Sequence, residues 1–192
     1  TFSYSITADT KKLLILGDSI SAGYGIKESE NWVSLLENYL NAGSETKYFL
    51  INSSVSGDTT SGGVSRISKA LEVNSPDFVL IELGGNDALR GYPLENIEKN
   101  LEKIVKEVLN KKSKPILMQI KIPPNYGKRY VSAFEDLYPS ISKKYQIPLV
   151  EFLLEKVALD SSLMQADGIH PNSLAQPIIA SAMKIALLKI IK

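Results

Sequence analysis

The 192-residue chain contains no cysteine and a single histidine, His170. Without cysteine it can form no disulfide and no thiolate zinc site, and it has no cysteine nucleophile. Imidazole is the side chain whose unperturbed pKa lies near neutral pH, which makes it the commonest general acid or base. If the protein uses imidazole chemistry, that chemistry takes place at His170.

The chain also lacks a charge excess and a long apolar run. Its 22 Lys and Arg residues against 21 Asp and Glu residues leave a formal charge of +1, far from the basic excess that binding to a phosphate backbone needs. No uninterrupted apolar stretch approaches the roughly 18 to 20 residues that span a bilayer. We therefore expect no nucleic-acid partner and no integral membrane segment.

A length of 192 residues with 44% hydrophobic residues is ordinary for one globular domain. We expect a single domain over residues 13–192, preceded by a polar segment, residues 1–12. The chain starts with Thr1 instead of Met. The polar segment is therefore interpreted as the remnant of a tag or export signal, or as native mature sequence.

From Leu13 onward, short apolar runs alternate with longer stretches of helical periodicity. Most of the runs are nearly continuous hydrophobics, as strands covered on both faces must be. The predicted strands are residues 13–16, 48–51, 78–83, 116–122 and 149–152. With helices between them they predict an α/β fold of three layers, α/β/α, around a five-stranded parallel, doubly wound sheet of the flavodoxin-like type. In such a fold the ligand crevice lies at the carboxyl ends of the strands.

Helical periodicity is clearest where apolar residues recur on one face with lysines and glutamates opposite. The predicted helices are residues 32–40, 64–71, 94–108, 130–145 and 173–191. Pro139 is expected to bend or interrupt the fourth helix. The last helix is predicted to turn inward Ile178, Ala182, Ile185 and either Leu188 or Ile191, and to turn outward Lys184, Lys189 and Lys192.

The first loop at the carboxyl edge reads Gly17-Asp18-Ser19, directly after the first predicted strand. If Ile20 begins a helical turn, Ser19 lies where backbone N–H groups point outward unpaired. A hydroxyl there can attack a carbonyl while its own amide stabilises the resulting oxyanion. A helix cap made by Asp18 and Ser19 explains the same dipeptide, so the motif alone is weak.

A nucleotide site in the glycine-containing stretch, residues 17–25, does not fit. A phosphate-binding loop needs Lys-Ser or Lys-Thr after its last glycine, whereas the chain has Gly23-Tyr24. The dinucleotide fingerprint Gly-x-Gly-x-x-Gly does not occur in the stretch either. We therefore expect no nucleotide cofactor.

Two further loops follow the second and third predicted strands. Gly57 can bring an unobstructed backbone N–H close to a bound substrate. The side-chain amide of Asn86, in Gly84-Gly85-Asn86-Asp87, offers a neutral donor. Each fragment in isolation is better explained as a turn or a helix cap.

The fourth fragment is Asp167-Gly168-Ile169-His170. A carboxylate three residues before an imidazole can fold back on a turn and accept from one ring nitrogen, which leaves the other nitrogen free to take a serine proton. Taken alone, a lone histidine is more often a satisfied surface or core residue. Four such fragments in loops at one edge of one sheet favour the catalytic interpretation.

In order along the chain, these fragments resemble the four sequence blocks of the SGNH hydrolases. The surrounding residues are similar to the thioesterase I, lysophospholipase and arylesterase branch of that family, from roughly Leu13 to the C-terminus. The similarity is carried by Gly17-Asp18-Ser19, Ala22-Gly23-Tyr24, Ser56-Gly57-Asp58-Thr59, Gly84-Gly85-Asn86-Asp87, Leu89-Arg90-Gly91, Pro124-Asn125-Tyr126-Gly127 and Asp167-Gly168-Ile169-His170-Pro171-Asn172.

The resemblance implies a serine esterase or thioesterase that works through an acyl-enzyme. Ser19 is then the nucleophile, His170 the general base, and Asp167 the carboxylate that holds the imidazole tautomer. The oxyanion hole consists of the amides of Ser19 and Gly57 and the side chain of Asn86. Such a mechanism needs no metal and no organic cofactor.

The substrate-binding residues are expected next to these groups. The segment Leu89-Arg90-Gly91-Tyr92 follows Asn86 closely and should border the crevice, where Gly91 lets it move over an acyl chain. A plain loop before the next helix explains this segment about equally well. Ile169, beside the histidine, and residues 126–130 are expected to add an apolar wall and a positive rim. A solvated face explains Lys128 and Arg129 better than such a rim does.

Two other functions remain open. A carbohydrate or small-ester deacetylase can use the same triad on an acetyl group, and a non-catalytic binding protein can share the fold. By resemblance we expect acyl ester or thioester substrates of medium to long chain length and a monomeric protein. The resemblance also implies a periplasmic or secreted protein, with a cytoplasmic location as the alternative.

Overall fold

A parallel sheet forms the middle of the protein, whose computed structural model describes residues 10–152 and 154–191. In these residues the sheet has five strands in the order β2-β1-β3-β4-β5, and each neighbouring pair is parallel. The strands are β1 (Thr10–Gly17), β2 (Lys47–Asn52), β3 (Phe78–Glu82), β4 (Lys114–Met118) and β5 (Leu149–Val150). The predicted fold class is confirmed.

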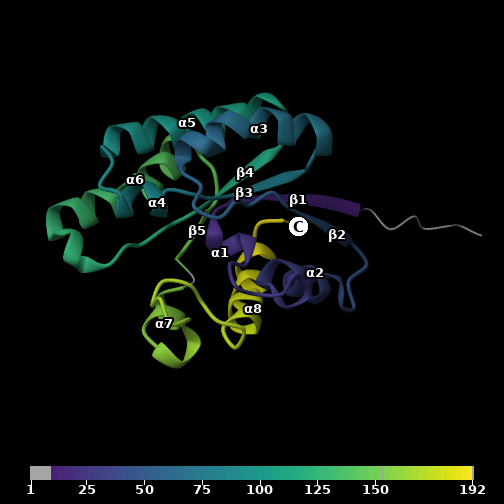
Figure 1. The fold of residues 1–192 in the computed structure, drawn as a ribbon. Helices are drawn as coiled ribbons and strands as arrows, with labels where there is room; N and C mark the ends of the chain where they lie inside the picture. Colours follow the sequence, from purple (N-terminus) through teal and green to yellow (C-terminus); the bar gives the residue numbers. More distant parts are fainter. Residues whose placement is uncertain (1–9, 153, 192) are drawn as a thin grey trace, which may run out of the picture.

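Helices cover both faces of the sheet (Figure 1). One layer contains α3 (Thr60–Asn74), α5 (Leu94–Asn110) and α6 (Lys128–Tyr145), and the other contains α2 (Trp32–Asn41) and α8 (Gln176–Leu187). Short helical segments lie in the loops: α1 (Ser19–Ala22), η1 (Glu28–Glu30), α4 (Gly85–Leu89), η2 (Pro124–Tyr126), α7 (Glu155–Ala158) and η3 (Ser161–Leu163). Among the described helices none is both long enough and apolar enough to cross a membrane.

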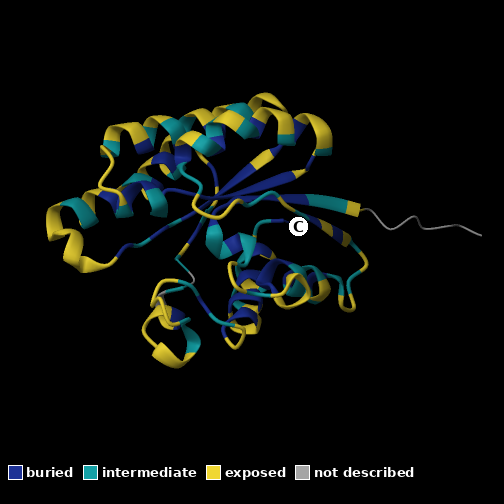
Figure 2. Cartoon of the chain, in the orientation of Figure 1, coloured by how far each residue is buried: buried dark blue, intermediate teal, exposed yellow. Residues whose placement is uncertain are grey.

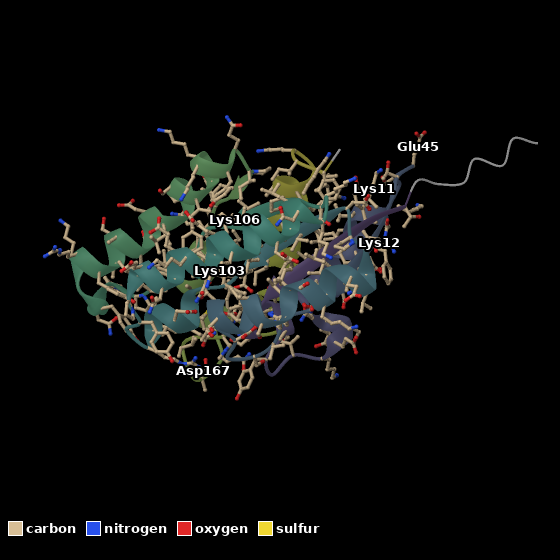
Figure 3. The ribbon with its side chains drawn as sticks, turned by 90° about the horizontal axis from the view of Figure 1, so that it is seen from above. Lys11, Lys12, Glu45, Lys103, Lys106 and Asp167 are labelled. Carbon is tan, nitrogen blue, oxygen red and sulfur yellow. The ribbon has the colours of Figure 1, made fainter. Side chains whose placement is uncertain are left out.

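The strands are apolar because the helices exclude water from both faces of the sheet. All of β3 is buried, and the apolar residues of β1 are fully inaccessible (Figure 2). On α5, Leu101 and Ile104 are buried, whereas Lys103 and Lys106 lie on the outer surface (Figure 3). Burying one aliphatic side chain contributes about 1.5 to 3 kcal/mol, so this two-sided burial holds the layers together.

The outer edge of the sheet is closed by side chains of α2. Asn41 pairs with both backbone groups of Tyr48 in β2, since its Nδ2 donates to Tyr48 O and its Oδ1 accepts from Tyr48 N, each at 2.8 Å. Glu37 accepts from Leu50 N at 2.6 Å. These side chains satisfy backbone groups that an edge strand would otherwise leave without a neighbour.

The strand boundaries differ from the predicted ones. β1 begins at Thr10, three residues before the predicted start, because residues 10–12 pair with residues 47–49 of β2. β4 ends at Met118 because β5 pairs only with Leu117 and Met118; the predicted strand extends to Ile122, which is buried outside the sheet. α6 runs through Pro139 without interruption.

The predicted inner face of the last helix is wrong at Ile178 and Ile185, although Ile191 is buried as predicted. Ile178 and Ile185 are 48% and 64% exposed, whereas Ile179 and Met183 are buried. α8 starts at Gln176, whose Oε1 accepts from Trp32 N at 3.0 Å and fixes the orientation of the helix against α2. Because apolar residues lie on both sides of this helix, periodicity alone did not separate its inner face from its outer one. Lys192 lies outside the described residues.

We expect the neighbouring residues Ile178 and Ile179 to respond oppositely to truncation. Ile179→Ala should lower the free energy of unfolding by about 2 to 5 kcal/mol because it opens a cavity in the core. Ile178→Ala should change it by less than about 0.5 kcal/mol, as a surface substitution does. Urea unfolding of both variants measures the difference. A larger loss of unfolding free energy in Ile178→Ala than in Ile179→Ala would show that Ile178 faces the core, as the sequence predicts.

Candidate active site

The loops after β1, β2 and β3 meet at the carboxyl end of the sheet. Because β1 lies between β2 and β3, Ser19 at its end is flanked by the loops of both neighbours. The β2 loop is fastened to β1, since Val55 N donates to Gly17 O at 3.1 Å. Figure 3 shows Asp167 far from Lys11, at the other end of the strands. The arrangement agrees with the crevice position expected for a doubly wound sheet.

Ser19 is the first residue of α1, and Asp18 caps that helix. Asp18 Oδ1 accepts from Ile20 N at 3.0 Å, and α1 ends at Gly23, which has a left-handed φ of 75°. The resulting tight turn exposes the serine hydroxyl at the end of the strand. Ser19 Oγ lies 2.9 Å from His170 Nε2.

His170 lies in a turn held by Asp167. Asp167 Oδ2 is 2.7 Å from His170 Nδ1, and Asp167 Oδ1 accepts from Ile169 N at 2.9 Å and from His170 N at 3.0 Å. These bonds, first of all the one from the His170 backbone, lower the pKa of Asp167 from its ordinary 3.8 to about 2. The carboxylate is therefore ionised at neutral pH and can only accept hydrogen bonds.

This geometry fixes the roles of the two imidazole nitrogens. Since Asp167 can only accept, Nδ1 of a neutral His170 must carry the proton, and the Nε2 lone pair faces Ser19 Oγ. The structure thus brings together Ser19, Asp167 and His170 as the sequence predicts. The arrangement can remove a proton from the serine hydroxyl.

Asn86 lies on α4, beside Asp18. Its Nδ2 donates to Asp18 Oδ2 at 3.0 Å, which fixes the plane of the amide and leaves its second N–H for another acceptor. α4 can start directly after β3 because Gly84 adopts a φ of 119°. A Cβ at Gly84 would also lie 2.3 Å from the Tyr138 hydroxyl, so glycine is required there.

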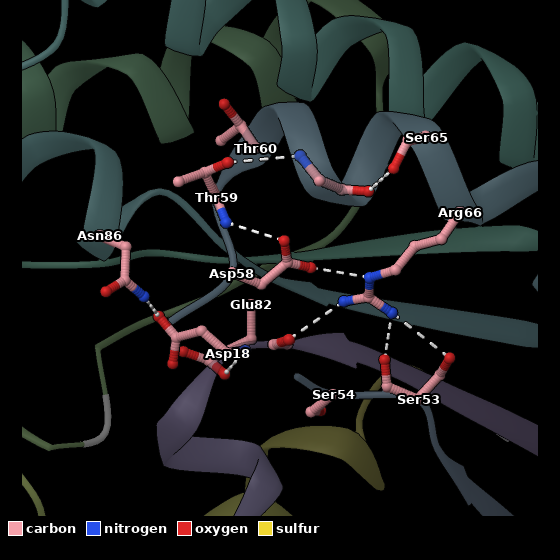
Figure 4. A network of polar contacts seen from close by, with 12 residues as sticks. Asp18, Ser53, Ser54, Asp58, Thr59, Thr60, Ser65, Arg66, Glu82 and Asn86 are labelled. Atoms are coloured by element: carbon pink, nitrogen blue, oxygen red, sulfur yellow. Dashed lines mark hydrogen bonds and ion pairs between the residues drawn. The ribbon is translucent and has the colours of Figure 1, made fainter. Parts of the chain in front are cut away.

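Gly57 follows β2 in a loop fixed by an ion pair. Gly57 has a φ of 77°, and the next residue, Asp58, pairs with Arg66 Nε of α3 at 2.7 Å. Arg66 also donates to Gly17 O at 3.1 Å and to Ser53 O (Figure 4). One guanidinium therefore joins the ends of β1 and β2 to α3 and holds the loop that carries Gly57.

The residues predicted to bind substrate have different surroundings. Arg90 donates to Gly57 O at 3.2 Å, and Tyr92 O accepts from Tyr130 Oη at 2.8 Å, so this segment joins the Gly57 loop to α6. Gly91 has a φ of 67°. Ile169 is 55% exposed beside His170, whereas Leu89 is partly buried against the core.

An open groove of about 620 Å³ lies between the starts of α5 and α6. Its lining includes Leu94, Tyr126, Tyr130 and Ala133, with Lys128 and Arg129 also in the wall. Residues 126–130 supply the expected apolar wall, while Lys128 and Arg129 are exposed, as a solvated face is. The Tyr130 hydroxyl ties this wall to Tyr92.

Glu82, a second buried carboxyl group next to Asp18, has no role in the sequence analysis. Glu82 Oε2, at the end of β3, accepts from Ser21 Oγ at 2.6 Å and from Asp18 N at 3.3 Å (Figure 4). Burial raises the pKa of Asp18 from 3.8 to about 6 and that of Glu82 well above its ordinary 4.5, to which the charge of Asp18 contributes further. The signal in the sequence was an acidic residue within an otherwise apolar strand.

On the side away from Asp18, Glu82 is surrounded mainly by apolar side chains. Glu82 lines a small cavity of about 20 Å³ whose other lining residues are mostly aliphatic and aromatic, including Trp32, Ile120 and Phe152. Over residues 10–152 and 154–191, no group of three His, Asp or Glu side chains is arranged to hold a metal ion. Glu82 is joined to Asn86 through Asp18, whose N–H donates to Glu82 and whose Oδ2 accepts from Asn86.

The sequence matches the model of the GDSL-like Lipase/Acylhydrolase family over residues 15–176. It is 46% identical over 176 residues to the thioesterase 1/protease 1/lysophospholipase L1 of Escherichia coli (strain K12), covering 92% of this chain and 82% of that protein. It is 44% identical over 181 residues to the arylesterase of Vibrio mimicus, covering 94% and 90%.

Solved structures show the same similarity. The psychrotrophic esterase EstA from Pseudoalteromonas sp., inhibited by monoethylphosphonate, superposes with a TM-score of 0.91 at 41% identity over 94% of this chain and 98% of that one. The crystal structure of TesA gives a TM-score of 0.88 at 40% identity, over 92% and 98%. The sequence similarity and the structural similarity therefore cover nearly the same part of the chain.

We expect Glu82→Gln to reduce the dependence of stability on pH. A carboxyl whose folded pKa is raised contributes fully below its unfolded pKa, and that contribution is lost as the pH rises through the folded pKa. Glu82 therefore lowers stability progressively above about pH 4.5. Glutamine keeps an oxygen for Ser21 and cannot ionise.

The measurement is the urea unfolding free energy of wild type and Glu82→Gln between pH 4 and pH 9. As the pH rises, the free energy of unfolding of the variant should increase relative to that of the wild type. Asp18, whose pKa in the folded protein is about 6, remains in both proteins and interacts with Glu82, so the difference between the two curves reports on the pair. A difference that stays constant over the whole range would contradict the raised pKa of Glu82.

Proposed function

We propose, from the premise that this chain belongs to the GDSL-like lipase/acylhydrolase family and is an ester-hydrolysing serine hydrolase, that Ser19, His170 and Asp167 carry out its reaction. One observation carries the assignment. Ser19 Oγ lies 2.9 Å from His170 Nε2, while His170 Nδ1 lies 2.7 Å from Asp167. Both distances lie in the range of hydrogen bonds, and the first allows the proton of Ser19 to pass to His170.

In the acylation step, Ser19 Oγ attacks the carbonyl carbon of the ester and His170 Nε2 takes the hydroxyl proton. The imidazolium that forms is stabilised by ionised Asp167. When the tetrahedral intermediate collapses, His170 gives this proton to the leaving alcohol or thiol. Water then attacks the acyl-enzyme by the same route, and the carboxylic acid leaves Ser19.

The negative charge on the carbonyl oxygen is held by neutral donors. We assign this role to the backbone N–H groups of Ser19 and Gly57 and to the Asn86 side chain. Support comes from the Asp18 bond, which orients the Asn86 amide, and from the ion pair that fixes the Gly57 loop. No step of this mechanism calls for a metal or an organic cofactor.

The substrate class proposed is acyl esters and thioesters, including those of lysophospholipid type. Relatives named thioesterase, lysophospholipase and arylesterase support the breadth of this class. The residues proposed to border the acyl group are Leu89, Arg90, Gly91, Tyr92 and Ile169, with the groove at residues 126–130 next to them. A single domain over residues 13–192, a monomer and a periplasmic or secreted location stay hypotheses.

We expect Ser19→Ala and His170→Ala each to abolish ester hydrolysis while the fold persists. Without the hydroxyl no acyl-enzyme forms, and without the imidazole no group removes the serine proton. The measurement uses p-nitrophenyl esters from acetyl to palmitoyl, an acyl-CoA and a lysophospholipid, with circular dichroism as the check on folding. Retention of more than a few per cent of the activity in either variant would overturn the mechanism.

The same panel separates the remaining functions. An acyl hydrolase of the proposed class responds to acyl chain length, whereas a deacetylase acts on acetyl groups alone. For the wild type, the rate should rise with pH between pH 5 and pH 8, because a general base acts in its unprotonated form. A flat profile over that range, with chemistry rate-limiting, would exclude His170 as the base.

We expect Asn86→Ala to lower kcat by about two to three powers of ten, as loss of one oxyanion donor does. The KM for the ester should change little, because this donor acts mainly in the transition state. Steady-state kinetics on one p-nitrophenyl ester measures both constants. An increase in KM with unchanged kcat would assign Asn86 to substrate binding instead.

A further inference from the structure

We infer that Gln165 and Tyr24 are positioning residues for His170, and that together they fix the distance between the base and Ser19. The inference rests on the proposed function of His170. Neither residue takes up a proton or forms a bond to substrate in the mechanism above. Their role follows from how two distant parts of the chain are joined.

Ser19 and His170 are 151 residues apart and belong to different parts of the fold. Ser19 follows the central strand β1, whereas His170 lies in the long connection between β5 and α8, which leaves the sheet (Figure 1). A separation of 2.9 Å between their side chains therefore needs a bond between these two segments. The hydrogen bond between Ser19 and His170 cannot hold the two segments together by itself, since it must break and re-form during the reaction.

The turn that carries His170 is closed within itself. Met164 and Pro171 form an antiparallel bridge, and Gln165 N donates to His170 O at 2.8 Å. Gly168, with a φ of 67°, lies at the tip, and its N–H donates to Gln165 O at 2.9 Å. The turn is thus a rigid unit whose base is Gln165.

The side chain of Gln165 fastens this unit to the loop after α1. Its Nε2 donates to Tyr24 O at 2.7 Å and to Pro171 O at 3.0 Å, so both hydrogens of one amide are used. Tyr24 N in turn donates to Ser19 O at 3.1 Å. A continuous path of hydrogen bonds therefore runs from the backbone of Ser19 through Tyr24 and Gln165 to the backbone of His170.

The loop after α1 leaves space for this side chain. A Cβ placed on Gly25 would lie 2.6 Å from Gln165 Oε1, and Gly25 has a φ of 72°. Glycine is therefore needed both for the backbone conformation and for the approach of the amide. The Gln165 amide therefore occupies the space that a side chain at residue 25 would need.

Tyr24 restrains the imidazole ring itself. Its ring centroid lies 4.6 Å from that of His170, with 37° between the planes. The Tyr24 side chain is 53% exposed, so it covers the imidazole without being part of the core. A ring in contact with one face of the imidazole limits rotation about the side-chain bonds of His170.

Loss of either restraint should lower kcat more than it changes KM. We expect Gln165→Leu and Tyr24→Leu each to reduce kcat about tenfold or more, because small displacements of a catalytic group have large effects on rate. Gly25→Ala should reproduce the Gln165→Leu effect by displacing the amide. Tyr24→Phe, which retains the ring, should restore the activity that Tyr24→Leu loses.

The single histidine of the chain provides a direct readout. Any imidazole resonance in the NMR spectrum belongs to His170, so its Nδ1 proton reports on the bond to Asp167. In Gln165→Leu and Tyr24→Leu we expect this resonance to broaden or shift, with little change in melting temperature. Phe49→Leu is the matched control, since Phe49 is also 53% exposed but lies on β2, and it should alter neither kcat nor the resonance.

The outcomes separate this inference from the proposed function. Wild-type kcat and an unchanged resonance in Gln165→Leu and Tyr24→Leu, with Ser19→Ala inactive, would overturn the positioning role alone. Activity in Ser19→Ala would overturn the proposed function itself. If Gln165→Leu does not fold, Gln165→Asn, whose amide is one methylene too short to reach both carbonyls, should show the same loss of kcat.

Discussion

The carboxylate of Asp18 holds together the elements on which the site is built. One of its oxygens caps α1, and the other accepts from Asn86 on α4. It therefore links the end of β1 to the helix that follows β3, with Glu82 beneath it. Such a group must lie inside the protein to reach these partners, and burial raises its pKa to about 6. Glu82 beneath it also has a raised pKa, and carboxyl groups with perturbed pKa values cluster at functional sites.

Much of the fold and of the candidate site followed from the sequence. Continuous apolar runs located the strands because strands covered on both faces have no polar side to show. The residues proposed for catalysis were found because serine, asparagine and histidine stood directly after predicted strands or in a short turn. The similarity to SGNH hydrolases is confirmed by the family match and by relatives at 42 to 46% identity.

The features that the sequence did not reveal depend on contacts between distant segments. The inner face of α8 is decided by Gln176 bonding to Trp32, 144 residues earlier, and no local periodicity contains that bond. The role of Glu82 depends on Asp18 and Ser21, which lie more than 60 residues away in the sequence. The same holds for Gln165, whose amide meets Tyr24 only after the chain has folded.

The side chains of α2 that bond to β2 have a consequence for the protein in concentrated solution. An uncovered edge strand can template the addition of a strand from another molecule, which is a route to aggregation. Asn41 and Glu37 occupy backbone groups of β2 that such a strand would need. At the opposite edge, β5 pairs over only two residues, too short a template for stable addition. Both edges of the sheet are thereby protected against the addition of a strand from another molecule.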